Sequence, residues 1–180
     1  GKSRRFGKYI DPAIFINKAV VTETEVFTPE NAFSDFAISP ELKRTIGAKG
    51  YITPTPIQDR AIPHILQGQD VVGIANTGTG KTAAFLIPLI NKVLNDRDQS
   101  VLIMVPTREL ALQINEELRG FSQGMRIFSA TFVGGTSVYR DLQKLRLHTH
   151  FIIGTPGRLK DMLERNALDL NSINSVVLDE

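Results

Sequence analysis

The 180-residue sequence contains no cysteine, which excludes a disulfide framework, a cysteine-based metal site and a cysteine nucleophile. No apolar run approaches the length of a membrane span, and the run at 13–16 is too short for the core of a signal peptide. Basic and acidic side chains nearly balance, so the net charge of +2 permits a polyanionic partner without demanding one. A cysteine-free chain suits a reducing compartment, so we expect an intracellular, cytoplasmic protein. Without a spanning run, we expect no membrane partner.

The first 32 residues differ from the rest of the chain. A basic start at 2–8 is followed by a mildly acidic stretch, and we interpret 1–32 as an extension or linker with a short helix around 11–19. The basic start is explained either as a nucleic-acid-binding arm or as a solvated terminus, and the second explanation is favoured because short charge runs are usually solvated. Residues 33–180 have the length and composition of one globular domain.

The most informative stretch is an apolar run at 71–75 that leads into a glycine-spaced turn and then a helix start. This order is typical of a phosphate-binding loop, because glycines let backbone N–H groups point at phosphate oxygens without a Cβ in the way. Lys81 would reach the β- and γ-phosphates, and the Thr82 hydroxyl would hold Mg²⁺. The alternative is an ordinary strand–turn–helix connection, since Ala75 replaces the first glycine of the generic pattern. The predicted nucleotide-binding loop comprises Ala75, Asn76, Thr77, Gly78, Thr79, Gly80, Lys81 and Thr82.

Apolar strands alternate with amphipathic helices along the rest of the chain, which predicts an α/β fold with a mainly parallel sheet. In such sheets ligands bind outside the carboxyl ends of the strands. We predict buried strands at 71–75, 100–105, 127–133, 151–153 and 175–178. We predict helices at 40–50, 55–66, 81–95, 108–120, 138–147 and 157–165.

Polar or glycine-rich clusters follow each predicted strand, so all of them should lie on one edge of the sheet. Thr107 and Thr155 occupy helix N-cap positions with an arginine close behind, and such a helix start binds phosphate well. The alternative is that both threonines merely cap helices and the arginines are surface charges. No aromatic residue is interleaved, so little base discrimination is expected. The candidate backbone-binding residues are Pro106, Thr107, Arg108, Gly134, Gly135, Thr155, Pro156, Gly157 and Arg158.

Two further patterns bear on nucleotide chemistry. Asp179 ends the last predicted strand and can orient Mg²⁺, while the adjacent Glu180 can take a proton from an attacking water. Thr55 to Gln58 fits a capping box, in which Gln58 only reaches back to its own helix. The functional alternative is that the Gln58 amide pairs with adenine while Tyr51 stacks on the base. Sequence spacing leaves that choice open.

In combination, these stretches resemble the motifs of the DEAD-box RNA helicases. Residues 50–58 look like the family's Q motif, and Phe33 lies upstream where the family has an isolated phenylalanine. Residues 75–82 match the family's A-x-T-G-x-G-K-T version of the phosphate loop, which accounts for alanine at the first position. The remaining clusters resemble motif Ia at 106–110, the GG motif at 134–135, motif Ib at 155–158 and the opening half of motif II at 179–180. The ordered set covers about residues 33–180 and is highly specific.

The resemblance implies a RecA-like first helicase domain of the phosphate-loop type, and with it an RNA-dependent ATPase that opens short duplexes. It implies ATP bound by Tyr51, Gln58 and the phosphate loop, and so favours the adenine contact for Gln58. It implies catalytic roles for Lys81 and Glu180, with Mg²⁺ near Thr82 and Asp179. RNA-backbone contacts are implied at the candidate residues of the strand-end clusters.

The chain departs from the family pattern in length. It stops inside motif II, and the second RecA-like domain, which in the family carries arginines that complete the ATP site, is missing. We therefore expect a fragment that is a poor enzyme alone. Two other functions remain open: a nucleotide-gated RNA clamp or assembly factor with slow ATP turnover, and a phosphate-loop ATPase without an RNA substrate.

Overall fold

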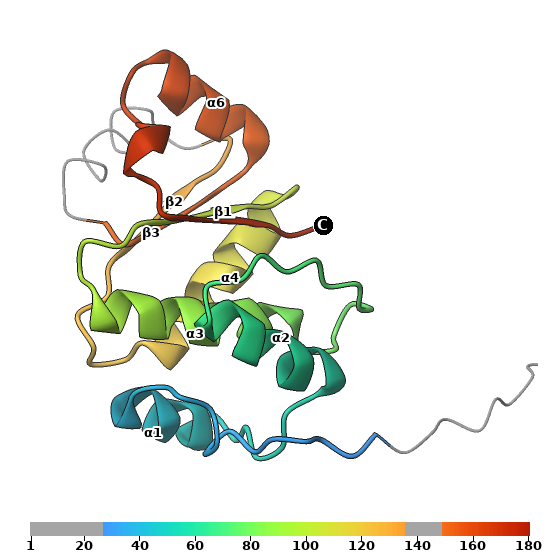
Figure 1. The fold of residues 1–180 in the computed structure, drawn as a ribbon. Coiled ribbons are helices and arrows are strands. Elements are labelled where there is room, and N and C mark those ends of the chain that lie inside the picture. The colour runs from blue at the N-terminus through green and yellow to red at the C-terminus, as the bar shows by residue number, and fades with distance from the viewer. Residues whose placement is uncertain (1–26, 136–148) are drawn as a thin grey trace, which may run out of the picture.

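A four-stranded sheet with helices on both faces forms the domain in the computed structural model, which describes residues 27–135 and 149–180 (Figure 1). All three strand pairings are parallel, and the strand order is β2-β3-β1-β4. The strands are β1 (Val101–Met104), β2 (Ser129–Phe132), β3 (Phe151–Gly154) and β4 (Ser175–Leu178). The helices are α1 (Pro40–Ala48), α2 (Pro56–Leu66), α3 (Lys81–Asn95), α4 (Arg108–Phe121), α6 (Pro156–Glu164) and the short 3₁₀ helix η2 (Leu170–Ser172). The predicted α/β class with a parallel sheet is confirmed.

Alternation along the strands divides the apolar side chains between the two faces of the sheet. Val101 and Ile103 of β1 face the larger core, which α1 to α4 cover, whereas Leu102 faces the smaller core beneath α6. In Figure 1 the sheet accordingly lies between α6 on one side and α1 to α4 on the other. Since successive side chains of a strand point to opposite faces, a strand buried on both faces is apolar at every position. This explains why β1 and β3 stand out as continuous apolar runs in the sequence.

The helices begin where the sequence places their caps. Ser39 accepts a hydrogen bond from Leu42 N at 3.2 Å, and Pro40 occupies the first turn of α1. Thr107 accepts one from Leu110 N at 3.2 Å at the start of α4. A side-chain oxygen at this position satisfies an N–H group that has no partner within the helix. Helix starts were therefore predictable to within a residue.

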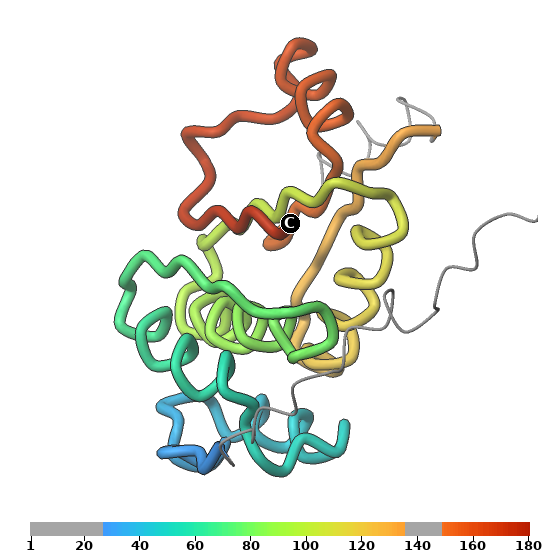
Figure 2. The backbone as a smooth tube through the Cα atoms, turned by 90° about the vertical axis from the view of Figure 1, so that its right-hand side faces the viewer, coloured from blue at the N-terminus to red at the C-terminus, as the bar shows by residue number. Residues whose placement is uncertain are grey.

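The predicted strand at 71–75 is wrong for this structure. The segment is not assigned as a strand, and Val72 and Ile74 are 94% and 96% exposed. Figure 1 draws it as a green coil and not as an arrow, and Figure 2 shows the same stretch of backbone in green from the side. An extended segment becomes a strand only through ladder hydrogen bonds to a neighbour. Among the described strands, β4 is at the edge of the sheet and has no further neighbour, and its Val176 and Leu178 are also exposed.

Several predictions fall on residues that the structure does not describe. The helices expected at 11–19 and 138–147 lie outside the described residues, and the domain boundary at residue 33 remains a prediction. Within the described ranges, no helix combines the length and the apolar character that crossing a membrane requires.

Candidate nucleotide and nucleic-acid site

Backbone hydrogen bonds join the carboxyl ends of all four strands into one edge, which we call the carboxyl rim (residues 105–108, 133–135, 155–158 and 179–180). Thr155 N donates to Phe132 O at 3.1 Å, linking the ends of β3 and β2. Val105 N donates to Gly154 O at 3.0 Å, and Asp179 N donates to Met104 O at 3.1 Å. The predicted strand-end clusters of β1 to β4 therefore lie side by side along the sheet.

The phosphate loop ends in two glycines with left-handed backbone conformations. Gly78 has φ +82° and Gly80 has φ +89°, which only glycine adopts without strain. Gly80 occupies the N-cap position of α3, no side chain caps that helix, and its first turn carries no acidic residue. Thr79 Oγ1 donates to Asn76 O at 2.7 Å and closes the turn. The loop thus presents uncapped helix N–H groups, which attract anions.

Lys81 brings the phosphate loop to the carboxyl rim. Its Nζ lies 3.9 Å from Glu180 Oε1, and both side chains are partly exposed. The pKa of the neighbouring Asp179 carboxyl is raised overall. Burial is the main cause, the negative charge of Glu180 adds to it, and the positive charge of Lys81 partly opposes it. The carboxylates of Asp179 and Glu180 thus lie near the ammonium group of Lys81, the first residue of α3. Across the described ranges, no cluster of three or more metal-binding side chains forms a complete site by itself.

Gln58 is buried and uses its amide in two internal hydrogen bonds. Gln58 Oε1 accepts from Thr55 N at 3.0 Å, which is the Gln58 half of the capping box of α2, while Thr55 Oγ1 is buried and makes no hydrogen bond. Gln58 Nε2 donates to Gly80 O at 3.1 Å. The capping alternative from the sequence is therefore present in the structure. An amide oxygen accepts two hydrogen bonds and an amide nitrogen donates two, so a base contact remains compatible with both bonds. The second bond also ties α2 directly to the phosphate loop.

Tyr51 belongs to an aromatic cluster beside the capping box. Its ring meets Phe33 edge-on at 5.9 Å and Phe121 at 5.3 Å between centroids. Burial and the nearby Glu117 carboxylate raise the pKa of the Tyr51 phenol, so this group stays neutral at physiological pH. Tyr51 is half-buried, and Phe33 is buried behind it. The aromatic ring proposed for base stacking is thus held from behind by two other rings.

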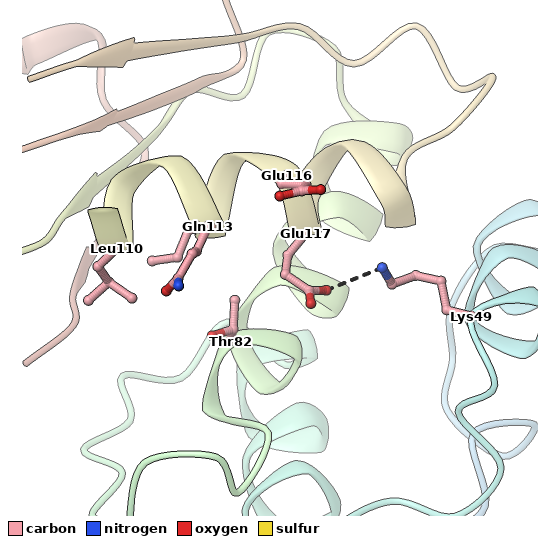
Figure 3. Close-up of a pocket in the computed structure, with 7 residues that line it drawn as sticks. Lys49, Thr82, Leu110, Gln113, Glu116 and Glu117 are labelled. Carbon is pink, nitrogen blue, oxygen red and sulfur yellow. Dashed lines mark ion pairs between the residues drawn. The ribbon is translucent and has the colours of Figure 1, made fainter. Parts of the chain in front are cut away.

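An open pocket of about 410 Å³ adjoins the start of α3 (Figure 3). Across it, Lys49 Nζ pairs with Glu117 Oε2 at 3.3 Å and lies 4.9 Å from the centre of the Phe121 ring. Thr82 therefore borders open space rather than packed side chains. The lining residues are Lys49, Thr82, Leu110, Gln113, Ile114, Glu116 and Glu117. Sequence reasoning missed this pocket, because its walls come from three segments whose approach no local pattern reveals.

Arg108 and the two glycines of the turn after β2 lie together on the exposed part of the carboxyl rim. Arg108 Nη1 is 3.4 Å from Gly134 O, and a Cβ at Gly135 would lie 3.3 Å from the same nitrogen. Thr107 caps α4, so the capping alternative also holds for this threonine. Its neighbours Pro106 and Arg108 are exposed. The guanidinium group and a glycine turn thus offer adjacent surfaces to an anion.

The cluster after β3 differs from the cluster after β1. Thr155 occupies the N-cap position of α6 but makes no capping hydrogen bond with its side chain. Arg158 Nη1 pairs with Asp161 Oδ2 at 3.4 Å, and its side chain is largely buried. Pro156 and Gly157 are exposed between them. Here the arginine is held in place by a carboxylate, while the threonine hydroxyl is not used in capping.

Sequence reasoning also missed Asp59, a buried carboxylate that binds the backbone of residues 30 and 31. An acidic residue in the first turn of a helix is expected on electrostatic grounds alone, so its position carried no distinctive signal.

Known proteins with similar sequences and structures belong to one family of helicases. The model of the DEAD/DEAH box helicase family matches residues 55–180. The chain is 43% identical over 150 residues to the DEAD-box ATP-dependent RNA helicase CshA of Bacillus cereus (strain ATCC 10987 / NRS 248), covering 82% of this chain and 28% of that protein. The CshA protein of Bacillus thuringiensis (strain Al Hakam) matches over the same shares at 43% identity.

Among solved structures, a DEAD box protein from the hyperthermophile Methanococcus jannaschii superimposes with a TM-score of 0.79 at 35% identity, covering 83% of this chain and 41% of that one. This match confirms the expected RecA-like architecture of the sheet and its helices. The chain spans less than a third of the length of the CshA relatives. Because the family model covers most of the sequence and the motifs stand in the family's order, the chain belongs to the DEAD/DEAH box helicase family.

Proposed function

We propose that this chain is the ATP-binding, RNA-contacting domain of an RNA-dependent ATPase that locally unwinds or remodels RNA duplexes. The observation that supports the proposal most strongly is the carboxyl rim: four strand-end clusters share one edge of the sheet, and Lys81 of the phosphate loop reaches Glu180 on that edge. The related CshA proteins are named ATP-dependent RNA helicases, and 43% identity makes a shared activity the simplest expectation. Since ATP and RNA are found inside cells, we propose an intracellular, cytoplasmic protein.

In this proposal the nucleotide extends from the phosphate loop to the aromatic cluster. Residues 75–82 would hold the phosphates with backbone N–H groups, and Lys81 would neutralise charge on the β- and γ-phosphates. Tyr51 would stack on adenine, and Gln58 would hydrogen-bond to its edge. The Gln58–Gly80 hydrogen bond supports this arrangement, because it links the base side of the site to the phosphate side.

Thr82 in the first turn of α3 and Asp179 after β4 have side chains that suit a magnesium ion. Thr82 and Asp179 offer the hydroxyl and carboxylate oxygens that Mg²⁺ prefers, and Mg²⁺ keeps most of its water when phosphates supply the remaining ligands. The raised pKa of Asp179 supports this assignment, because a carboxylate that burial disfavours gains most from a nearby cation. Bound Mg²⁺ would offset negative charge on the transferred phosphate. Glu180 would accept a proton from the attacking water.

The carboxyl rim would contact the RNA backbone at two places. Arg108 with the Gly134–Gly135 turn forms one contact, and Thr155 to Arg158, with Pro156 and Gly157 between them, forms the other. These groups recognise phosphate and sugar and do not read bases, so little sequence specificity is expected. A second RecA-like domain would complete the ATP site, as the family resemblance implies and as the greater length of the relatives supports.

Replacing both Arg108 and Arg158 by alanine should abolish most of the RNA stimulation of ATP hydrolysis in the purified protein and leave the basal rate unchanged. Loss of two phosphate contacts should weaken binding to polyuridylate by about tenfold or more, and reduce the slope of log K against log salt by about one to two. The measurements are steady-state hydrolysis with and without RNA, and a salt titration of RNA binding.

The matched control replaces Arg44 and Arg119, two exposed arginines away from the carboxyl rim, by alanine. This double variant has the same net charge as the test variant and should behave like the unmodified protein. RNA stimulation that survives in the Arg108/Arg158 variant, or an unmodified protein whose hydrolysis ignores RNA, would contradict the proposed function. Circular dichroism checks the fold, since Arg158 also pairs with Asp161.

A further inference from the structure

Asp59 is a buried carboxylate with an unusual set of partners. Only 4% of the residue is exposed. Its Oδ2 accepts from Glu30 N at 2.8 Å, and its Oδ1 accepts from Asn31 N at 3.1 Å and Asn31 Nδ2 at 2.8 Å. All three donors come from a segment 28 or 29 residues earlier in the chain. The carboxylate therefore fixes the segment that leads into the domain, which we call the leading segment (residues 30–33), against α2.

The carboxylate of Asp59 does not cap its own helix. Its oxygens bind another segment, whereas Gln58 accepts the N–H of Thr55, the N-cap residue of α2. Burial alone would raise the pKa of Asp59, but the side chain of Asn31, the amides of Glu30 and Asn31 and the charge of Arg60 together hold it below its usual value. Burying a charge is unfavourable unless hydrogen bonds compensate for it. The hydrogen bonds that compensate for burying the Asp59 charge come mainly from the leading segment. The carboxylate therefore holds that segment in place.

The leading segment ends in the aromatic cluster. Phe33 follows Asn31 by two residues, is 6% exposed, and meets Tyr51 edge-on at 5.9 Å and Phe36 at 5.8 Å between centroids. Ala32 N donates to Asp35 Oδ2 at 2.8 Å, which makes the turn after Asn31 compact. A shift of the leading segment at Asp59 would therefore be passed to Phe33, and from Phe33 to the ring of Tyr51.

We propose that Asp59 is a positioning residue for the base side of the nucleotide site: it fixes the leading segment so that Phe33 supports Tyr51 in the orientation that stacks on adenine. This inference rests on the proposed function, because it assumes that Tyr51 contacts the base. Asp59 follows Gln58 directly on α2, and Gln58 holds Gly80 of the phosphate loop. The first turn of α2 thus fixes both ends of the site: Gln58 the phosphate loop, and Asp59 the aromatic cluster.

The test compares two ligands that share phosphates but not a base. Asp59→Asn removes the charge and turns one acceptor into a donor, and it should raise the Kd for Mg²⁺-ATP by about five- to tenfold. The Kd for Mg²⁺-tripolyphosphate should change by less than about twofold, since that ligand has no base. Titration calorimetry measures both, at a temperature where thermal unfolding shows the variant to be fully folded.

The matched control is Asp96→Asn. Asp96 also accepts a backbone and a side-chain hydrogen bond, from Asp98 N at 3.0 Å and Gln99 Nε2 at 2.7 Å, but it is exposed and follows the far end of α3. The Asp96→Asn substitution should leave the affinities for Mg²⁺-ATP and for Mg²⁺-tripolyphosphate unchanged. Asn31→Ala removes one of the three donors from Asp59 and gives a milder variant, with a smaller loss of ATP affinity in the same direction.

A double variant separates positioning from simple destabilisation. In a Phe33→Ala background, Asp59→Asn should cause less than about twofold further loss of ATP affinity, because the support it provides has already been removed. An equal loss for ATP and tripolyphosphate, additive effects in the double variant, or a loss of stability with unchanged ATP affinity would overturn the proposal. If the unmodified protein binds no ATP, the proposed function fails, and this inference fails with it.

Discussion

Replacing Lys81 by alanine should raise the Kd for Mg²⁺-ATP by about 10–100-fold, the loss expected for a charge-assisted hydrogen bond to phosphate. The stability of the protein should hardly change. Lys81 pairs with Glu180 at 3.9 Å, and both side chains are partly exposed, so the pair contributes about 0–1 kcal/mol to the free energy of unfolding. Titration calorimetry and urea unfolding of the same preparation measure the two quantities.

The same change should make nucleotide binding more sensitive to acid. Lys81 lowers the pKa of Asp179, which is already raised overall, so removing the lysine charge raises it further. The protonated form then persists to higher pH, and Mg²⁺ binds only the ionised carboxylate. On acidification, the Mg²⁺-ATP affinity of the variant should therefore begin to fall at a higher pH than that of the unmodified protein.

Lys160→Ala is the matched control for Lys81→Ala. It removes one lysine from the exposed surface of α6, where Lys160 pairs with Glu164 at 3.7 Å. ATP affinity and its pH dependence should match those of the unmodified protein. If Lys81→Ala binds Mg²⁺-ATP normally, the phosphate loop does not hold the triphosphate as proposed.

Gly80→Ala should lower the free energy of unfolding by about 2–4 kcal/mol and weaken ATP binding. Alanine at φ +89° is strained by about 1–2 kcal/mol. Its Cβ would also overlap the Gln58 amide nitrogen and lie 3.2 Å from Thr55 Oγ1. Gln58 would have to move, and its hydrogen bonds to Thr55 N and Gly80 O would be lost. Urea unfolding and titration calorimetry measure these losses.

Gly78→Ala isolates the backbone strain. Gly78 has a similar φ of +82°, but a Cβ there meets no atom within 4 Å. Its replacement should cost only the strain of about 1–2 kcal/mol. The difference between the two variants therefore measures what Gln58 contributes by holding Gly80. Equal destabilisation by both would show that the Gln58–Gly80 contact is unimportant for stability.

Elements with strong local signals could be predicted from the sequence. The predicted bounds of α3 and β4 coincide with the observed ones, because a glycine turn marks the start of α3 and polar residues flank the apolar run of β4. The carboxyl rim was also predictable, since parallel strands that each end in a polar cluster must bring those clusters to one edge. These features depend on short stretches of sequence or on a general rule of sheet topology.

The error at 71–75 has a different origin. The apolar pattern there is as strong as in β1, but Val72 is almost fully exposed in the structure. An apolar pattern indicates that a segment can be buried in a sheet, whereas a strand also needs a paired neighbour. Which segments pair is a property of the whole fold, so a local pattern does not determine it.

Contacts between distant segments could not be predicted either. Asp59 binds residues 30 and 31, and Gln58 binds Gly80, across 22 residues or more. For Gln58 the sequence offered two explanations: the structure contains the Gln58–Thr55 hydrogen bond of the capping box, and the adenine contact stays a prediction. A side chain with two donors and an acceptor serves its own helix and a distant loop together, and no spacing rule indicates the second partner.

The outer side of β4 has a consequence for handling the protein. Val176 and Leu178 are exposed on one face of β4, and the outer edge of β4 has no hydrogen-bonded neighbour within the part of the chain that the structure describes. A strand edge with free amide and carbonyl groups and exposed apolar side chains is a template for intermolecular β-pairing. Concentrated samples should therefore self-associate and form aggregates, and a charged substitution such as Val176→Lys should keep them dispersed.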